Sequence, residues 1–462
     1  MDTKALRQKI LDLAIHGKLV PQDPNDEPAS VLLERIRAEK ERLIKEGKIK
    51  KGKKSAKTSD KPHYPFELPK GWCFTNIGEL LINRDGERKP VSSAIRSKQS
   101  NKIYDYYGAA GVIDKIDDYL FDEKLLLIGE DGANLLSKSK NNAFFAEGKY
   151  WVNNHAHVLD ATDKNLLEYV AIVINAIKLD DYITGSAQPK LSQDNLNKIP
   201  IVLPPLSEQK RIMEAIIHWS LLIEQIEQNK IDLQASIKQA KSKVLDLAIH
   251  GKLVQQDPND EPASELLKRI NPKAEIITDN GHYQKLPEGW TICKLKDICS
   301  KLVDGDHNPP KGTKETTEYL MLSAQNIVND NIVYTNGVRY LNHDAFETSD
   351  KRTKVMQGDL LITIVGTLGR SCVFSDNKKI TLQRSVACLT PLIYNHFLKY
   401  YMDSSSIQKY MTTNAKGTAQ KGFYLNQLEQ LPIMIPPLTE QQRIVARIEK
   451  IFARLDVIES AL

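Results

Sequence analysis

The sequence predicts an α+β protein in which two α/β domains are separated by two long antiparallel coiled-coil helices, in a pseudo-twofold circular arrangement. Three observations lead to this prediction. Two pairs of nearly identical blocks recur along the chain, a long helical pattern occupies its middle, and two dissimilar stretches rich in β-branched residues lie between the repeats. The 462 residues are enough for two to four domains.

The repeated blocks divide the chain into halves. KILDLAIHGKLVPQDPNDEPASVLLERI (residues 9–36) returns as KVLDLAIHGKLVQQDPNDEPASELLKRI (residues 243–270), 234 positions later. IPIVLPPLSEQKRI (residues 199–212) returns as LPIMIPPLTEQQRI (residues 431–444), 232 positions later. The nearly equal shifts indicate two half-proteins fused head to tail.

The middle of the chain has the pattern of a coiled coil. From Ile212 to Leu247 apolar residues alternate at spacings of four and three, and Lys230 is the one interruption. We expect a helix that starts after the LPPL prolines with Ser207 as its N-cap and ends near His250-Gly251, because glycine suits a left-handed cap. About 44 residues give a rod of roughly 65 Å.

The chain termini repeat this helix in two pieces. Residues 438–462 keep the register of its first half, after Thr439 as the expected N-cap, and residues 1–16 match its second half. Together they are expected to rebuild a copy of the central helix and to pack antiparallel to it. The loops of the repeated blocks, rich in Pro, Asp and Asn, are expected to be ordered, with Ser30 and Ser264 capping short helices.

These features predict five segments. They are an N-terminal repeat block with a Lys-rich linker (1–67), a first variable domain (68–203), a central helix and repeat block (204–285), a second variable domain (286–437) and a C-terminal helix (438–462). Inside the variable domains, strands are expected at residues 124–129, 359–366 and 380–389, and single helices at 164–176 and 392–412.

Composition points to a cytoplasmic protein. Hydrophobic residues make up 41% and charged residues 27%, and no apolar run approaches the roughly 18 residues that a membrane span requires. The N-terminus is charged and amphipathic, so we expect no secretory signal and no membrane partner. The five cysteines are scattered without zinc-site spacing, which favours reduced thiols.

The positive charge gathers near the N-terminus. The net charge is +5, and residues 46–57 hold six lysines and one acid. This run could bind phosphates or could be a solvated linker, and whether the Lys45–Lys57 stretch meets DNA or a partner subunit stays open. Neither variable domain is strongly basic, so a partner is expected to supply part of any attraction to DNA.

Polar loops recur at matching places in the two variable domains. GSAQPK (185–190) aligns with GTAQKG (417–422), and WVNNHAHVL (151–159) aligns with TLQRSVACL (381–389). Asn and Gln can pair with adenine, and Lys and Arg can contact guanine or phosphate, whereas an ordinary turn or strand hydrogen bond is the alternative for each single residue. The predicted DNA-binding residues are Lys138, Asn153, Asn154, His155, Gln188 and Lys190 in the first domain, and His307, Asn308, Lys311, Arg370, Gln383, Arg384, Gln420 and Lys421 in the second.

Catalytic motifs are missing from the sequence. It has no P-loop, no G-x-S-x-G and no H-E-x-x-H. Asn308-Pro309-Pro310-Lys311 is similar to the N-P-P-aromatic tetrad of DNA adenine methyltransferases, but a lysine stands where the aromatic would stack on a flipped base. We therefore predict no catalytic residue, metal ligand or cofactor site in this chain.

The paired LDLAIHGKLV, PPL[ST]EQ[KQ]RI and LP[KE]GW motifs resemble those of the specificity subunit of type I restriction–modification enzymes, over essentially the whole chain. The resemblance implies a non-catalytic subunit that reads a bipartite, asymmetric double-stranded DNA target, with one half-site for each variable domain. It also implies helices that dock two modification (methyltransferase) subunits. S-adenosylmethionine, ATP and Mg²⁺ would then bind to partner subunits, which include restriction (translocase and endonuclease) subunits in a full complex.

The alternative is a freestanding sequence-specific DNA-binding protein. A self-contained methyltransferase or nuclease is disfavoured because no cofactor motif accompanies the polar loops. The target bases, the gap between half-sites, the residues that contact bases and the presence of a restriction subunit stay open.

Overall fold

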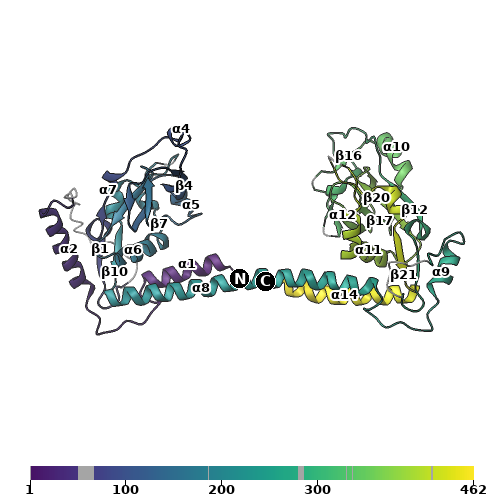
Figure 1. Cartoon of the computed structure of the whole chain (residues 1–462), viewed down its shortest axis with the longest axis horizontal. Coiled ribbons are helices and arrows are strands. Elements are labelled where there is room, and N and C mark those ends of the chain that lie inside the picture. Colours follow the sequence, from purple (N-terminus) through teal and green to yellow (C-terminus); the bar gives the residue numbers. More distant parts are fainter. Residues whose placement is uncertain are drawn as a thin grey trace. The chain divides into compact units, whose positions relative to one another are not determined.

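The computed structural model describes residues 2–49, 67–185, 187–278, 286–328, 330–335, 337–417 and 420–462. The Lys-rich run from Lys50 onward and the central positions of the two aligned polar loops (Ser186, Thr418 and Ala419) lie outside these residues. The chain forms two compact units, Met1–Asn229 (unit 1) and Lys230–Leu462 (unit 2). Each unit mixes helices with strands, which confirms that part of the predicted fold class (Figure 1).

Unit 1 contains three β-sheets. The four-stranded sheet of antiparallel pairs has the order β2-β9-β6-β7, with bounds Ile82–Asn83, Ala156–Asp160, Leu125–Gly129 and Ala143–Ala146. A second sheet has the order β4-β3-β8-β5, with bounds Gly111–Ile116, Tyr104–Gly108, Lys149–Val152 and Phe121–Asp122, and its β3–β8 pair is parallel. The third sheet pairs β1 (Cys73–Asn76) with β10 (Pro200–Leu203).

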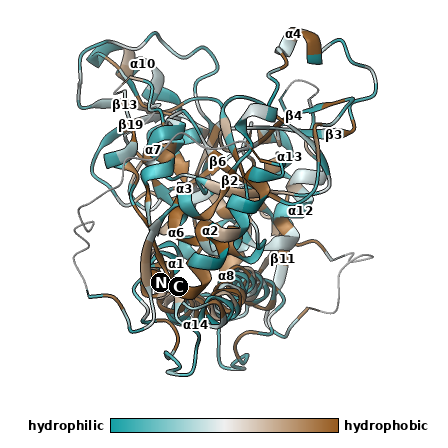
Figure 2. Ribbon diagram, turned by 90° about the vertical axis from the view of Figure 1, so that its left-hand side faces the viewer, coloured by the Kyte–Doolittle hydropathy of each residue, from teal (hydrophilic) through white to brown (hydrophobic). Residues whose placement is uncertain are grey.

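The helices of unit 1 surround these sheets. They are α1 (Thr3–Ile15), α2 (Ala29–Lys45), α3 (Ile77–Leu80), α4 (Ser93–Arg96), α5 (Asn134–Ser137), α6 (Asn165–Ala176) and α7 (Gln193–Lys198), with 3₁₀ turns at Asp85–Glu87 and Asp180–Tyr182. Every residue of β6 is buried, because this continuous apolar strand lies in the middle of its sheet with α6 against it. Figure 2 shows the hydrophobic residues in the interior and hydrophilic residues along the peripheral loops.

Unit 2 repeats the main sheet of unit 1 with a different sequence and differs from unit 1 in its smaller sheets. The sheet β12-β20-β17-β18 (Cys299–Asp304, Val386–Pro391, Leu360–Thr363 and Ser371–Val373) matches β2-β9-β6-β7 strand for strand. The sheet β16-β13-β19 (Arg339–Tyr340, Tyr319–Leu322 and Lys379–Leu382) again contains a parallel pair, β13–β19. β11 (Thr291–Lys294) pairs with β21 (Pro432–Ile435), and an additional hairpin joins β14 (Ile327–Val328) to β15 (Asn331–Ile332).

The helices of unit 2 include α9 (Ala263–Ile270), α10 (His343–Thr353), α11 (Asn395–Asp403), α12 (Ser405–Thr413), α13 (Leu425–Glu429) and α14 (Leu438–Ser460), with 3₁₀ turns at Leu295–Ile298 and Ala324–Asn326. In the described part of the chain, no helix combines the length and apolar character needed to cross a bilayer.

The central helix α8 spans Leu206–Ile249, which is 44 residues, as the spacing predicted. Its first part belongs to unit 1, where α1 lies beside it and Arg7 forms an ion pair with Glu227 at 3.1 Å. Its second part belongs to unit 2, where Lys241 pairs with Asp456 and Glu459 of α14 at 2.6 and 2.9 Å. Lys230, which interrupts the apolar pattern, donates to the main-chain carbonyl of Leu462.

The three repeated motifs meet at a buried glutamate in each unit. In unit 1, Glu208 of the PPLSEQ motif accepts hydrogen bonds from Trp72 Nε1 of the LPKGW motif at 2.8 Å and from Gln22 Nε2 at 3.1 Å. In unit 2, Glu440 accepts from Trp290 Nε1 at 3.0 Å and from Gln256 Nε2 at 3.1 Å. The motifs therefore recur together because each copy builds the same junction.

The pKa values of these glutamates reflect their burial. Glu208 is 1% exposed and Glu440 is fully buried. Burial raises the pKa of both carboxyl groups, and the Gln and Trp donors oppose that rise. Ion pairs of 2.6 Å between Arg211 and Asp26 and between Arg443 and Asp260 lie beside the two junctions.

Glycines of the repeats occupy positions that a side chain would not fit. Gly17 has a φ of +64° and Gly251 a φ of +62°, as expected for left-handed helix ends. A Cβ at Gly17 would lie 2.5 Å from Pro69 Cγ, and one at Gly251 would lie 2.4 Å from Pro287 Cγ. The glycine of the repeated block thus allows the helix end to pack against the proline of the LP[KE]GW motif.

The predicted helix caps are wrong. α8 and α14 begin at Leu206 and Leu438, one residue before Ser207 and Thr439, and Thr439 instead donates to Asp260. The short helices α2 and α9 begin after a proline, not at Ser30 and Ser264. The first N–H group of α2, from Ala29, donates to the carbonyl of Gly71 at 2.8 Å, so a crossing segment satisfies it and no capping side chain is required.

Two predicted elements of unit 2 are each divided. The single helix expected at residues 392–412 is α11 and α12, because Ser404 is extended and its hydroxyl donates to the carbonyl of Tyr401 at 2.7 Å. The strand expected at 380–389 is β19 and β20, with a turn at residues 383–385. That turn carries two of the predicted DNA-binding residues.

Candidate nucleic-acid interface

Polar loops converge at one end of the unit 2 sheets. The amide of Arg384 donates to the carbonyl of Asp306 at 3.0 Å, which joins the β19–β20 turn to the loop that carries His307. Ile364, just after β17, donates to the carbonyl of Ser385 at 2.9 Å, and Gly366 donates to the carbonyl of Lys421 at 3.1 Å. Three loops with predicted DNA-binding residues are therefore fixed to one another by backbone hydrogen bonds.

Unit 1 repeats this arrangement. Glu130, just after β6, donates to the carbonyl of His155 at 2.8 Å, and Gly132 donates to the carbonyl of Pro189 at 3.0 Å. Leu191 returns a hydrogen bond to the carbonyl of Glu130 at 2.7 Å, as Phe423 does to Ile364 at 2.8 Å in unit 2. Each segment that aligned across the two variable domains thus occupies the same topological position in both.

The predicted DNA-binding residues differ in how exposed their side chains are to solvent. The exposed ones are Asn154, His155, Gln188, Lys190, His307, Asn308, Lys311, Arg370, Arg384, Gln420 and Lys421, and Gln383 is half-buried. Asn153 is 3% exposed, and its side-chain oxygen accepts from the amide of His155 at 2.8 Å. Its geometry is that of a side chain that shapes a turn.

Several of the other predicted residues have protein partners. Lys138 donates to the carbonyls of Asn175 and Ile177 at the C-terminal end of α6, and burial lowers the pKa of its ammonium group. Lys190 lies 3.3 Å from Glu130, and Arg370 donates to the carbonyl of Ile327 at 3.4 Å. The two histidines each face an aspartate: His155 and Asp131 lie 2.7 Å apart, and His307 and Asp304 lie 2.6 Å apart.

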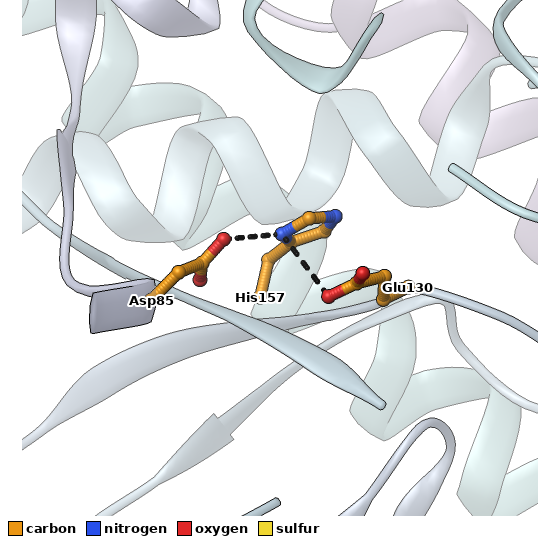
Figure 3. Close-up of side chains that lie close together, drawn as sticks. All are labelled: Asp85, Glu130 and His157. Atoms are coloured by element: carbon orange, nitrogen blue, oxygen red, sulfur yellow. Dashed lines mark hydrogen bonds and ion pairs between the residues drawn. The ribbon is translucent and has the colours of Figure 1, made fainter. Parts of the chain in front are cut away.

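A charged cluster that sequence reasoning missed lies beneath the loops of unit 1. Figure 3 shows Asp85 and Glu130 on either side of the His157 ring. His157 is 1% exposed, and its Nδ1 lies 2.6 Å from Asp85 and 3.8 Å from Glu130. Its Nε2 lies 2.8 Å from the carbonyl of Leu191. Both ring nitrogens therefore face oxygen atoms of the protein.

Arg88 completes this cluster, which we call the ionic cluster (Asp85, Arg88, Glu130 and His157). Its guanidinium lies 2.7 Å from Glu130 and 3.5 Å from Asp85, and donates to the carbonyl of Ala156 at 2.6 Å. Burial raises the pKa of the Asp85 carboxyl, but His157, Arg88 and the amide of Val158 outweigh burial and hold that pKa below its ordinary value.

The ionic cluster has the residue types of a metal site but the spacing of a hydrogen-bonded network. Ligand atoms of Asp85, Glu130 and His157 all lie within 4.8 Å of one another. The 2.6 Å between His157 and Asp85 is a hydrogen-bond length, and Arg88 already supplies a cation beside both carboxylates. No local sequence pattern predicted the cluster, because its members come from three separate segments.

Unit 2 has a partial counterpart. Asp304, at the end of β12, is 7% exposed and pairs with both Arg352 and His307. Arg352 comes from α10 and also donates to the carbonyl of Asp304 at 2.8 Å. Ile364 holds the position of Glu130, so unit 2 has no second carboxylate there. The two units thus support equivalent loops with different charged groups.

This geometry defines a duplicated protein with two recognition domains, in which one topology presents two different sets of exposed polar side chains. The sequence model described as "Type I restriction modification DNA specificity domain" matches residues 69–237 and 287–461. The chain belongs to this family and is a DNA specificity subunit of a type I restriction–modification system.

Curated relatives agree. The type I restriction enzyme EcoEI specificity subunit of Escherichia coli is 27% identical, over 99% of this chain and 90% of that protein. The EcoAI specificity subunit of Escherichia coli is 32% identical, over 64% of this chain and 62% of that protein. A crystal structure of the HsdS subunit from Thermoanaerobacter tengcongensis matches with a TM-score of 0.49 and 16% identity, over 86% of this chain and 93% of that one.

Proposed function

We propose that this chain is the non-catalytic subunit that reads a bipartite, asymmetric DNA target, with one half-site for each unit. The observation that supports it is the pairing of equivalent loops with unlike side chains: Asn154 in unit 1 stands where Arg384 stands in unit 2. Asparagine favours adenine and arginine favours guanine, so the two units are suited to different bases.

The repeated junctions support two equivalent docking surfaces. Each unit carries the same buried glutamate junction next to a pair of helices, so two copies of one partner could bind in the same way. We propose that these partners are two adenine methyltransferase subunits, which bind S-adenosylmethionine, and that restriction subunits that use ATP and Mg²⁺ join the full complex.

The finer architecture belongs to the same proposal. The antiparallel coiled coil and the pseudo-twofold circular arrangement would hold two unlike recognition domains at a fixed separation, and half-site spacing follows from such geometry. The formal net charge of +5 on 462 residues is modest, so partners are proposed to add to the attraction for DNA phosphates. All five cysteines are free thiols, in keeping with the proposed cytoplasmic location.

The deciding experiment maps adenine methylation in cells that express this chain with its neighbouring methyltransferase gene, and in cells that lack this chain. An interrupted, asymmetric motif that depends on the chain is expected. Methylation that ignores the chain, together with tight specific DNA binding by the chain alone, would favour a freestanding DNA-binding protein and contradict the proposal.

Two matched variants test the assignment of one half-site to each unit. Gln188 and Gln420 are exposed side chains on equivalent loops of units 1 and 2. Gln188→Ala is expected to relax the motif at one half-site, and Gln420→Ala at the other, because each removes donors and acceptors from one unit only. A change in both half-sites by either single variant would contradict the assignment.

A further inference from the structure

A groove in unit 1 lies between two polar segments. One wall is a strap, which we define as residues 88–96, and the other is the turn of residues 153–155. Tyr106 and Ile113 also line the groove, whose volume is about 480 Å³. This volume lies in the range of sites that hold a small polar group or a flat ring.

The strap is fixed along its length. Trp151 Nε1 donates to the carbonyl of Lys89 at 2.6 Å, and the Tyr106 hydroxyl exchanges hydrogen bonds with Val91 at 2.9 and 3.2 Å. Arg96 lies over the Tyr106 ring at 4.2 Å and pairs with Asp114 at 2.8 Å. A wall held at these points can present its exposed hydroxyls, on Ser92 and Ser93, at defined positions.

The opposite wall offers polar atoms without partners in the described parts of the chain. The amide side chain of Asn154 is exposed and has no protein hydrogen bond among the described residues. His155 uses Nδ1 toward Asp131 at 2.7 Å, which leaves Nε2 available. An asparagine amide and a histidine nitrogen present both donors and acceptors, which is what the edge of a base pair requires.

The ionic cluster connects this groove to the loop that carries Gln188 and Lys190. Arg88 begins the strap and pairs with Glu130 at 2.7 Å, while Lys190, on the hairpin that carries Gln188, lies 3.3 Å from the same carboxylate. Glu130 also holds the turn, because its amide donates to the carbonyl of His155. Glu130 therefore contacts three separate segments, two through its carboxylate and one through its main-chain amide.

We propose that this groove reads base-pair edges of double-stranded DNA in the half-site of unit 1, with Asn154 as a contacting residue and with Arg88 and Glu130 as positioning residues. This inference rests on the proposed function and names where unit 1 carries it out. One exposed lysine, Lys89, lies within the strap and another, Lys98, lies just beyond its end, where they can meet phosphates.

The test compares Asn154→Ala with Asn141→Ala, an exposed asparagine of the same unit outside the groove. The full chain is coexpressed with its methyltransferase, and methylation rates are measured on DNA duplexes that carry every single base-pair change in both half-sites. Asn154→Ala is expected to lower discrimination at one base pair of one half-site by about tenfold to a hundredfold. The other half-site and the Asn141→Ala variant are expected to match the wild type.

Arg88→Ala tests the positioning role, with Arg88→Lys as the conservative variant. The alanine variant is expected to weaken discrimination across several positions of that same half-site, and the lysine variant to restore part of it, because lysine keeps the charge without the planar fork. If Arg88→Ala unfolds unit 1, hydrogen exchange will show it. The result with Asn154→Ala then tests the proposal by itself.

Two outcomes would overturn the inference. One is an Asn154→Ala variant that discriminates as well as Asn141→Ala, and the other is a loss of discrimination in both half-sites. A wild-type chain that directs no methylation motif would instead remove the proposed function and the inference with it, so the two failures are distinguishable.

Discussion

The two units share their junctions and differ in their loops. Unit 1 joins Trp72, Gln22 and Glu208 as unit 2 joins Trp290, Gln256 and Glu440, with distances that agree within 0.2 Å. Above these junctions the same strand order supports unlike loops, held in unit 1 by four buried or half-buried charged residues and in unit 2 by Asp304 and its two partners. The comparison teaches that a duplicated frame can keep its buried junctions constant while its polar loops diverge.

The largest expected effects break the shared junctions. Trp72→Ala and Trp290→Ala should each destabilise their own unit by about 3–5 kcal/mol, because each removes a buried indole and leaves a buried glutamate short of a donor. Hydrogen exchange of β6 and β17 would report units 1 and 2 separately.

Trp219→Ala is the control for this pair, since the Trp219 side chain on α8 is 44% exposed and should matter less. Clearly unequal losses from Trp72→Ala and Trp290→Ala would show that the two junctions are not equivalent.

The next largest effect is a loss of stability that should differ between the two units. Arg88→Ala should destabilise unit 1 by about 3 kcal/mol, because it removes the guanidinium beside two carboxylates whose side chains are 8% and 13% exposed. Arg352→Ala should cost unit 2 only about 1 kcal/mol, since the Arg352 side chain is 48% exposed. Urea denaturation followed by hydrogen exchange would measure both, and equal losses would argue against a cluster specific to unit 1.

The stability of the two units should also respond differently to acid. The pKa of Asp85 is lowered from 3.8 in the folded chain, so Asp85 stabilises unit 1 at pH values above 3.8, and this stabilisation is lost as the pH falls through its folded pKa. Asp85→Asn should therefore flatten the acid limb of the stability profile of unit 1. A profile between pH 7 and about pH 2 that is unchanged by the variant would contradict the assigned role.

The buried glutamates Glu208 and Glu440 should change stability with pH in the direction opposite to Asp85, and by the same amount in both units. Burial raises the pKa of Glu208 and Glu440 above 4.5, so the folded chain binds their protons more tightly than the unfolded chain does. Their contribution favours folding as the pH falls through the folded pKa toward 4.5. Carbon-13 titration of the two carboxyls is expected to give matching shifts, and a difference between them would distinguish the junctions.

The smallest effect lies on the helix pairs. Lys241→Met should destabilise unit 2 by less than about 1 kcal/mol, because its partners Asp456 and Glu459 are 60% and 45% exposed. The difference from the wild type should shrink as salt is raised from 0.1 to about 1 M. Thermal unfolding at both salt concentrations measures it, and a loss that persists at high salt would point to packing by the lysine stem.

The sequence predicted much of the frame from local patterns. The alternating spacing from Ile212 predicted a helix of the length that α8 has, and His250-Gly251 predicted its left-handed end, which Gly251 forms. Helix starts were wrong at Ser207, Thr439, Ser30 and Ser264. In α2 and α9 the first N–H groups, of Ala29 and Ala263, donate to the carbonyls of Gly71 and Gly289. Side-chain capping rules cannot foresee a donor that finds its acceptor in a segment distant along the chain.

By itself, the sequence determined the duplication, the length of the central helix, the family and the positions of the polar loops. Each of these can be recognised from contiguous blocks of residues. Only the tertiary structure decided that the Asn153 side chain shapes its own turn, that Asn154 has no hydrogen-bond partner among the described residues, and that Arg88 and Glu130 join separate segments. The physical reason is that burial and hydrogen-bond partners depend on segments far apart along the chain, such as Asp85 and His157, which are 72 positions apart and which no local pattern connects.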